Sequence, residues 1–225
     1  MLKSDLKLDW CSFPAAKFAC QHWHYSGTIP RGRLVKIGVY ERGTFIGCII
    51  FSPGANNHLG NIIGLSQTEC CELTRVALRS HSSQVSRMVA IAIRMLRQNS
   101  PGLRAIISFA DPDQGHNGAI YQAGNWIYTG ITRPQRECMI GGQIIHKRVI
   151  GRRFGSIKGI PRGPLKWKYR YIMPLDEEIR KRVEMMQKPY PKREQCAGSK
   201  ANVAPCAQRG EGGVIPTPAL QVCHG

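Results

Sequence analysis

The segment that most constrains this chain is an apolar run, 105–110, which ends abruptly at Asp111-Pro112. Proline has no N–H to donate to a sheet ladder, so a strand over this run must stop there. A glycine-rich loop follows, then a short helix at 117–123 that carries Tyr121, and then a strand at 126–132. Ligands tend to bind at the carboxyl ends of strands in α/β sheets. The segment therefore predicts an enzyme-like site, with a carboxylate at a strand end and a phenol on the next helix.

The other predicted elements indicate a mixed α/β fold rather than a repeat or an all-helical protein. The long helix has Ser82 and Ser83 as predicted caps and an apolar stripe on one face. From residue 188 onward the chain is polar, rich in Pro and Gly, and without periodicity, which predicts a disordered tail over 188–225. The remaining predicted elements are a helix at 17–24, a hairpin at 36–51 with its turn at 41–43, a strand at 72–78, the long helix at 84–98, a half-exposed final strand at 166–173 and a helix at 176–187.

With 225 residues, 42% of them apolar, the chain is long enough for one domain with a sizeable core, and two small domains are the alternative. It contains no apolar run of eighteen residues and no secretory signal at its start. We therefore expect a cytoplasmic protein without a membrane span. The nine cysteines include no Cys-x-x-Cys pair, which favours buried thiols over a disulfide framework or a zinc ribbon.

The formal net charge of +18 predicts a polyanionic partner. Positive charge is concentrated in the segment 147–170, which has no acidic residue and has aromatic residues interleaved. Repeated glycines and two prolines make a helix there unfavourable, so we predict a flexible basic loop that follows a DNA backbone. A merely solvated charged loop is the alternative. The nine predicted DNA-binding residues are Lys147, Arg148, Arg152, Arg153, Lys158, Arg162, Lys166, Lys168 and Arg170.

Three motifs carry a resemblance to a known family. They are His22-Trp-His24-Tyr25-Ser-Gly27, the segment from Asp111 to Tyr121, and Lys166-Trp-Lys-Tyr-Arg-Tyr-Ile-Met-Pro-Leu175. Together with the strand 72–78 before the long helix, they resemble the Mom family of bacteriophage DNA-modification proteins, within the GNAT acyltransferase superfamily. The resemblance implies one GNAT-like domain over 1–175, with a mixed, mostly antiparallel sheet flanked by helices and a basic extension toward the C-terminus.

The resemblance also implies an activity. The family converts the N6-amino group of adenine in phage DNA to an N6-carbamoylmethyl group, which protects the DNA from host restriction enzymes. Its functional residues carry over to His24, Tyr25, Asp111 and Tyr121. Asp111 is expected to accept the N6 proton or to hydrogen-bond the amino group, and Tyr121 to protonate the leaving group. Inside a duplex N6 is paired, so the base must be extruded or the strand opened, and aromatic side chains suit stacking on it.

The donor and the metal are left open by the sequence. GNAT enzymes usually hold the pyrophosphate of coenzyme A on a glycine-rich loop before the long helix, but here that loop contains Ser82 and Ser83 and no glycine. The candidates are acetyl-CoA held by those two serines and a glycyl group from glycyl-tRNA, which is isomeric with carbamoylmethyl. Iron is a further implication, with His22, His24 and Asp111 as its candidate ligands.

Each residue also has a purely structural interpretation. Asp before Pro is common in turns, a helix tyrosine beside an isoleucine is commonly core, and His58 and His116 lie in loops where histidines are usually just exposed. Two other functions compete with DNA modification. One is an acyl-CoA N-acetyltransferase acting on a protein or small amine, and the other is a non-catalytic DNA-binding protein, for which the charge alone would suffice.

Overall fold

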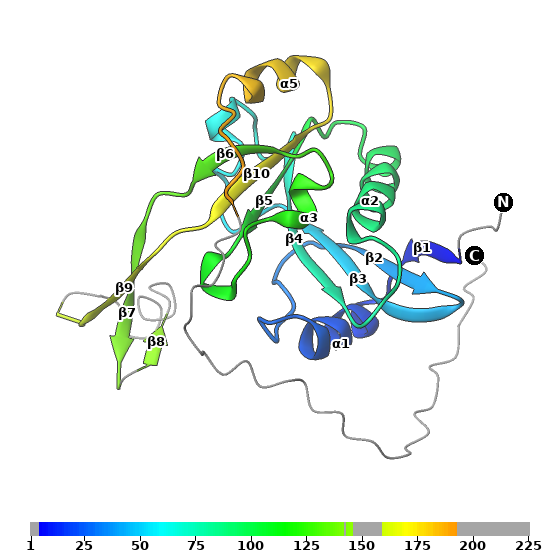
Figure 1. Ribbon diagram of the computed structural model, residues 1–225, viewed down its shortest axis with the longest axis horizontal. Coiled ribbons are helices and arrows are strands. Elements are labelled where there is room, and N and C mark those ends of the chain that lie inside the picture. Colours follow the sequence, from blue (N-terminus) through cyan, green and yellow to red (C-terminus); the bar gives the residue numbers. More distant parts are fainter. Residues whose placement is uncertain (1–4, 142, 146–158, 193–225) are drawn as a thin grey trace. The chain divides into compact units, whose positions relative to one another are not determined.

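The computed structural model describes residues 5–141, 143–145 and 159–192 of the chain. Its main sheet has seven strands in the order β1-β2-β3-β4-β5-β10-β6 (Figure 1). The elements that build this body are β1 (Leu6–Trp10), α1 (Phe13–Trp23), β2 (Val35–Glu41), β3 (Thr44–Ser52), β4 (Cys70–Leu78), α2 (Val85–Asn99), β5 (Ala105–Ala110), α3 (Ala119–Gln122), β6 (Ile127–Ile131), β10 (Tyr169–Pro174) and α5 (Glu177–Glu184), with short 3-10 turns at Asn61–Ile63 and Pro112–Gln114.

All neighbouring strands of this sheet are antiparallel except β4 and β5, which are parallel. These two pair only over Cys70–Glu72 with Ala105–Ile107, and beyond that point each continues without the other. Strand β4 also has a bulge: Ile50 lies opposite Arg75 and Phe51 opposite Leu73, so Thr74 is the extra residue. The sheet is therefore forked between β4 and β5, and the expected mixed, mostly antiparallel sheet flanked by helices is confirmed.

Helices cover both faces of the sheet. Helix α2 packs on the face formed by Ile46, Ile49 and Phe51 of β3 and by Leu73 and Ile106. Helix α1 covers Ile50 and Ala77 on the opposite face. On that same face α5 packs on Ile107 and its neighbours. The alternation of side chains along each strand separates the two apolar sets.

The predicted elements differ from the structure at several ends. Helix α1 begins at Phe13, earlier than the predicted 17, because the Ser12 hydroxyl accepts a hydrogen bond from Ala15 N–H and starts the helix. Strand β1 was not predicted. The last strand, β10, was predicted to be half-exposed, but it lies between β5 and β6 with Tyr171 and Ile172 buried. The alternating basic residues that suggested exposure are satisfied by local partners.

The predicted basic loop is only partly described. Its residues 147–158 lie outside the described part, whereas Arg162–Lys166 forms β9, a regular strand rather than a loop. It pairs with β7 (Gln135–Ile140), which also pairs with β8 (Gln143–Ile145). The second sheet therefore has the order β8-β7-β9, and Figure 1 shows β7 and β9 leading away from the body.

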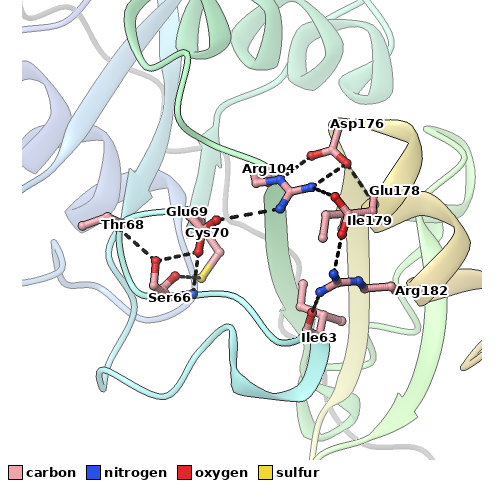
Figure 2. Close-up of polar contacts among 10 residues, drawn as sticks. All are labelled: Ile63, Ser66, Thr68, Glu69, Cys70, Arg104, Asp176, Glu178, Ile179 and Arg182. Carbon is pink, nitrogen blue, oxygen red and sulfur yellow. Dashed lines mark hydrogen bonds and ion pairs between the residues drawn. The ribbon is translucent and has the colours of Figure 1, made fainter.

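Helix α5 is held to the sheet by an ion-pair network around Arg104 (Figure 2). The Arg104 Nε lies 2.8 Å from Asp176 and its Nη2 lies 2.6 Å from Glu178. Asp176 also caps α5 by accepting a hydrogen bond from Ile179 N–H. Glu178 in turn pairs with Arg182 on the next turn of the helix. The start of β5 and the start of α5 are thereby joined by charged groups.

Residues 188–192, the first part of the predicted tail, belong to the described part of the chain. Lys188 N–H donates to Tyr128 O, and the Tyr190 hydroxyl donates to Trp126 O, so these residues lie against β6. Residues 193–225 lie outside the described part. Among the helices of the described residues, none is long and apolar enough to cross a membrane.

Candidate active site

The fork between β4 and β5 is bridged at its base by Ser108. This buried serine has its Oγ 2.8 Å from the Leu73 carbonyl oxygen on β4 and 2.8 Å from the Tyr121 hydroxyl. From Ser108 onward β5 is no longer paired with β4. Ser108 therefore joins the strand that carries Leu73 to the short helix that carries the predicted catalytic phenol.

Tyr121 lies on α3 with its ring packed on Trp126 and Tyr171. Burial raises the pKa of Tyr121 to about 12, with the nearby Tyr25 and Glu72 raising it further while the Ser108 hydrogen bond opposes them. A phenol with such a pKa keeps its proton at neutral pH. Tyr121 can therefore donate that proton to a departing oxyanion but is a poor base.

The start of α3 is fixed by a glycine. Gly118 has φ +85°, and a Cβ built on it would lie 2.3 Å from the Tyr171 ring. The Tyr171 hydroxyl donates to Asn117 O, so the ring of Tyr171 occupies this space firmly. Only glycine meets both requirements, and the turn before Tyr121 depends on it.

His24 and Tyr25 follow the last turn of α1. Burial, together with the charges of Arg75 and His116, lowers the pKa of His24 to about 4, so its ring is neutral at physiological pH. Its Nδ1 accepts a hydrogen bond from Ser26 N–H at 3.1 Å. A neutral imidazole that accepts at Nδ1 carries its proton on Nε2, so His24 presents a donor there.

Tyr25 extends into solvent, with 53% of its surface exposed, and its ring lies 4.3 Å from that of His24. His116, in the loop before α3, meets Tyr25 edge-on with ring centroids 5.3 Å apart. No pattern in the sequence distinguished His116 from an ordinary loop histidine. The fold makes it, with Tyr25, an aromatic pair beside the fork.

Glu72 was also missed by the sequence analysis. It is the last β4 residue paired with β5, and it is partly buried. Burial raises the pKa of Glu72 above its ordinary value, although Lys168, Arg75 and a hydrogen bond from Ala55 N–H oppose the shift. A carboxylate whose proton affinity is raised by desolvation is the kind of group that serves as a general base. The available signal was a single acid in a strand whose other polar residues are only Thr74 and Arg75.

Arg75, beyond the bulge in β4, was not predicted either. Its Nη1 donates to Thr74 O at 2.8 Å, while its buried Nε has no hydrogen-bond partner among the described residues. Buried donors usually have partners. This nitrogen therefore offers an unused hydrogen bond on the same face of the sheet as Glu72.

Asp111 ends β5 as predicted and also has the structural role that was its alternative. Its side chain accepts from Asp113 N–H at 3.1 Å and so caps the following 3-10 turn. Its Oδ2 lies 3.6 Å from Lys168 Nζ. Because Lys168 also acts electrostatically on Glu72, Asp111 is linked to the fork through this lysine.

The predicted basic residues separate into four groups. Arg162 is exposed, whereas Lys166 and Lys168 are paired with Asp113 and Asp111. The prediction that Arg170 contacts DNA disagrees with the structure. Its Nε donates to Thr129 Oγ1 at 2.8 Å and its Nη2 to Thr129 O at 3.1 Å, so its guanidinium ties β10 to β6. The other five lie outside the described residues.

Ser82 and Ser83, which were predicted to hold a cofactor phosphate, already donate hydrogen bonds to a carboxylate of the protein itself. The Glu41 carboxylate, at the end of β2, accepts from Ser82 N–H at 3.0 Å, from Ser83 N–H at 2.8 Å and from the Ser83 hydroxyl at 2.6 Å. These bonds lower the pKa of Glu41 to about 2, the Ser83 hydroxyl contributing most. The capping residue of α2 is Gln84, which makes no side-chain bond. The predicted serine cap is therefore replaced by a carboxylate from a distant turn.

The three candidate metal ligands do not form a cluster in the structure. His22 is exposed, with its Nδ1 2.9 Å from Phe18 O and its ring stacked on Phe18. No group of three His, Cys, Asp or Glu side chains suited to a metal occurs in the described part of the chain. The predicted set of His22, His24 and Asp111 thus does not fit an iron ion in this arrangement.

Comparison with known proteins places these features in context. "Methylcarbamoylase mom" of Escherichia phage Mu is 24% identical over 204 residues, which cover 84% of each chain. A ribosomal L7/L12 alpha-N-protein acetyltransferase shares 13% identity over 79% of this chain and 98% of its own, with a TM-score of 0.45. An N-acetyltransferase from Staphylococcus aureus Mu50 shares 11% identity over 76% and 97%, with a TM-score of 0.45. These two likenesses concern the fold alone. The model of the Mom protein family matches residues 5–192, and the chain therefore belongs to that family.

Proposed function

We propose that this protein is a phage DNA-modification enzyme that converts the N6-amino group of adenine in DNA to an N6-carbamoylmethyl group, which shields the DNA from host restriction. Its family and the name of its phage Mu relative support the reaction class. The observation that carries the proposal is the place of Tyr121 at the fork, where its hydroxyl is hydrogen-bonded to Ser108, which also bonds Leu73, the β4 neighbour of Glu72. Burial raises the pKa of Tyr121 most, and the charges of Tyr25 and Glu72 raise it further.

The chemistry of N6 explains why these groups are needed. The N6 lone pair is delocalised into the purine ring, so the nitrogen attacks well only if a base removes a proton as the new bond forms. Glu72, with its raised pKa, takes that proton. Tyr121 returns a proton to the leaving group. His24, which donates from Nε2, stabilises the oxygen on which charge develops.

Tyr25 and His116 are the proposed stacking surfaces for the extruded adenine. A flipped base is usually held between aromatic or apolar side chains, and these two rings stand at the mouth of the fork with Tyr25 half-exposed. Asp111 holds Lys168 beside the fork, and the pair is well placed to orient the amino group and a neighbouring phosphate.

The contacts of Glu41 favour a glycyl-tRNA donor over acetyl-CoA. A diphosphate at the start of α2 would have to displace a carboxylate that already has three hydrogen bonds. In the proposed first step N6 attacks the glycyl ester carbon, the ester C–O bond breaks, and the tRNA hydroxyl leaves with a proton from Tyr121. The glycyl group is an isomer of carbamoylmethyl. Its rearrangement breaks the bond from N6 to the carbonyl carbon and the bond from the methylene carbon to the amine. It forms a bond from N6 to the methylene carbon and one from the amine to the carbonyl carbon, with no atom or electron gained or lost.

Nucleoside analysis tests the proposal. Plasmid DNA from cells expressing the protein is digested to nucleosides and examined by mass spectrometry. We expect a modified deoxyadenosine with the wild type and with Glu184→Gln, an exposed acid on α5, and its loss with Glu72→Gln and Tyr121→Phe. Unmodified nucleosides together with tight DNA binding would instead identify a non-catalytic DNA-binding protein. An acetylated protein or amine with unmodified DNA would identify an ordinary acetyltransferase.

A further inference from the structure

The second sheet forms a narrow arm, defined here as residues 132–141, 143–145 and 159–168. Strand β7 pairs with β9 near the body and with β8 farther along, and only Cys138 has strand partners on both sides. Over most of its length, the described part of the arm is therefore a two-stranded ribbon. Figure 1 shows β7 and β9 leading away from the main sheet.

The arm carries unneutralised positive charge. Arg133, Arg136 and Arg162 are exposed, and none of the three has an ion pair with a described residue. Their guanidinium groups thus remain available to phosphates or to base edges. Leu165, opposite Arg136 in the register, leaves 51% of its surface exposed, so the ribbon has no covering layer at that position.

The root of the arm touches the candidate active site. Thr132 N–H donates to Lys168 O at 2.8 Å, and Lys168 N–H donates to the Thr132 hydroxyl at 3.0 Å, which closes the two strands together. Lys168 and Lys166 reach Asp111 and Asp113, the acids of the loop that follows β5. A polymer lying along the arm would therefore pass directly beside the fork.

The width of the arm suits one groove of duplex DNA. The major groove of B-DNA is about 12 Å wide and admits a two-stranded β-ribbon, whereas the minor groove is about 6 Å wide. We propose that the arm lies in the major groove of duplex DNA next to the target adenine, with Arg133, Arg136 and Arg162 contacting its phosphates and base edges. The place of the target adenine beside the arm rests on the proposed function, in which that base is extruded into the fork.

Binding measurements distinguish an arm in the major groove from one in the minor groove. Fluorescence anisotropy with full-length protein would compare a plain DNA duplex with one whose pyrimidines carry bulky C5 substituents, which project into the major groove. We expect the substituents to weaken binding at least tenfold, and a minor-groove ligand such as netropsin to leave binding unchanged. An RNA duplex of the same sequence should bind more weakly, because its major groove is deep and narrow. Displacement by netropsin, indifference to the substituents, or equal binding of the RNA duplex would overturn the proposal.

Arginine variants test the arm itself. Arg136→Gln and Arg162→Gln should each weaken binding and lower the slope of log K against log salt by about one, as expected for one lost phosphate contact. Arg97→Gln, an exposed arginine on α2, is the matched control and should leave the slope unchanged. Variants that behave like the control would contradict the assignment of the arm.

The two proposals can fail separately. If the arm variants lose duplex affinity while the wild type leaves every deoxyadenosine unmodified, the arm is correct and the enzymatic function is wrong. If modified deoxyadenosine forms but the arm variants keep full affinity and slope, the function is correct and the arm is wrong.

Discussion

At the scale of single residues, burial raises the pKa of Glu72 and the pKa of Tyr121, the two groups proposed to transfer protons. Glu72 becomes easier to protonate and Tyr121 harder to deprotonate, both mainly because they are removed from water. At neutral pH this favours a carboxylate that can accept a proton beside a phenol that can supply one. The pKa of His24 is lowered to about 4, so its ring is neutral and its Nε2 is available as a hydrogen-bond donor.

Glu72→Gln should reduce the modification rate by about 10²–10⁴-fold, the usual contribution of a general base. Because the pKa of Glu72 is raised, the wild-type rate should fall as the pH decreases through that raised value, since the protonated acid cannot accept the N6 proton. Single-turnover rates against pH measure this, with Glu184→Gln as control. A Glu72→Gln enzyme of normal rate, or one that retains the wild-type acid limb, would refute the assignment.

Glu41→Gln should lower the melting temperature in a pH-dependent way. The folded-state pKa of Glu41 is depressed to about 2, so its stabilising effect is complete above the ordinary glutamate pKa and is lost as the pH falls toward 2. The difference between wild type and variant in thermal denaturation should therefore be larger at pH 7 than at pH 3. A difference that grows on acidification would show that the Glu41 contacts with Ser82 and Ser83 are not the cause.

At the scale of elements, α3 and α5 are short helices whose positions depend on contacts with the rest of the protein. Helix α3 has only four residues, and its position comes from Gly118 before it and from the packing of Tyr121. Helix α5 is held by the Arg104 network rather than by length. Such elements are stabilised by tertiary contacts rather than by helix propensity.

Gly118→Ala should destabilise the protein by about 3 kcal/mol, because an alanine there adds left-handed backbone strain to a clash with the Tyr171 ring. Gly115→Ala is the matched control: its φ is +69°, but nothing lies within 4 Å of its Cβ position, so only the strain of about 1 kcal/mol remains. Urea denaturation measures both. Equal losses in the two variants would show that Tyr171 yields to the methyl group.

Arg104→Gln should loosen α5 selectively. The glutamine cannot pair with Asp176 and Glu178 together, so amide hydrogen exchange should accelerate over Glu177–Glu184 while α2 remains protected. Arg94→Gln, an exposed arginine on α2, provides the control. Uniform acceleration throughout the chain would indicate general destabilisation instead of local release.

At the scale of the whole molecule, the sequence predicted individual helices and strands but not the contacts between residues far apart in the chain. The strand that ends at Asp111 and the helix that carries Tyr121 follow from Pro112 and the glycines, and both are confirmed. The fork was not predictable, because parallel pairing of β4 with β5 joins residues about 35 positions apart. Glu41 meets Ser82 and Ser83 for the same reason, through a contact that no local pattern encodes.

The same limit explains the errors among the basic residues. Charge density draws attention to the segment after residue 131, but density does not show which arginines face inward. The Arg170 guanidinium donates hydrogen bonds to Thr129. Arg133 and Arg136, which lie outside the predicted segment, are exposed. The partner of each charge is decided by the register of β7, β9 and β10.

A crystal structure of the protein bound to a DNA duplex that contains its target adenine would test the central claim most directly. We predict that the adenine is extruded, that its ring lies against Tyr25 and His116, and that its N6 lies within hydrogen-bonding distance of the Glu72 carboxylate with Tyr121 on the far side of the fork. An adenine that remains stacked in the duplex, or that binds away from the fork between β4 and β5, would contradict it.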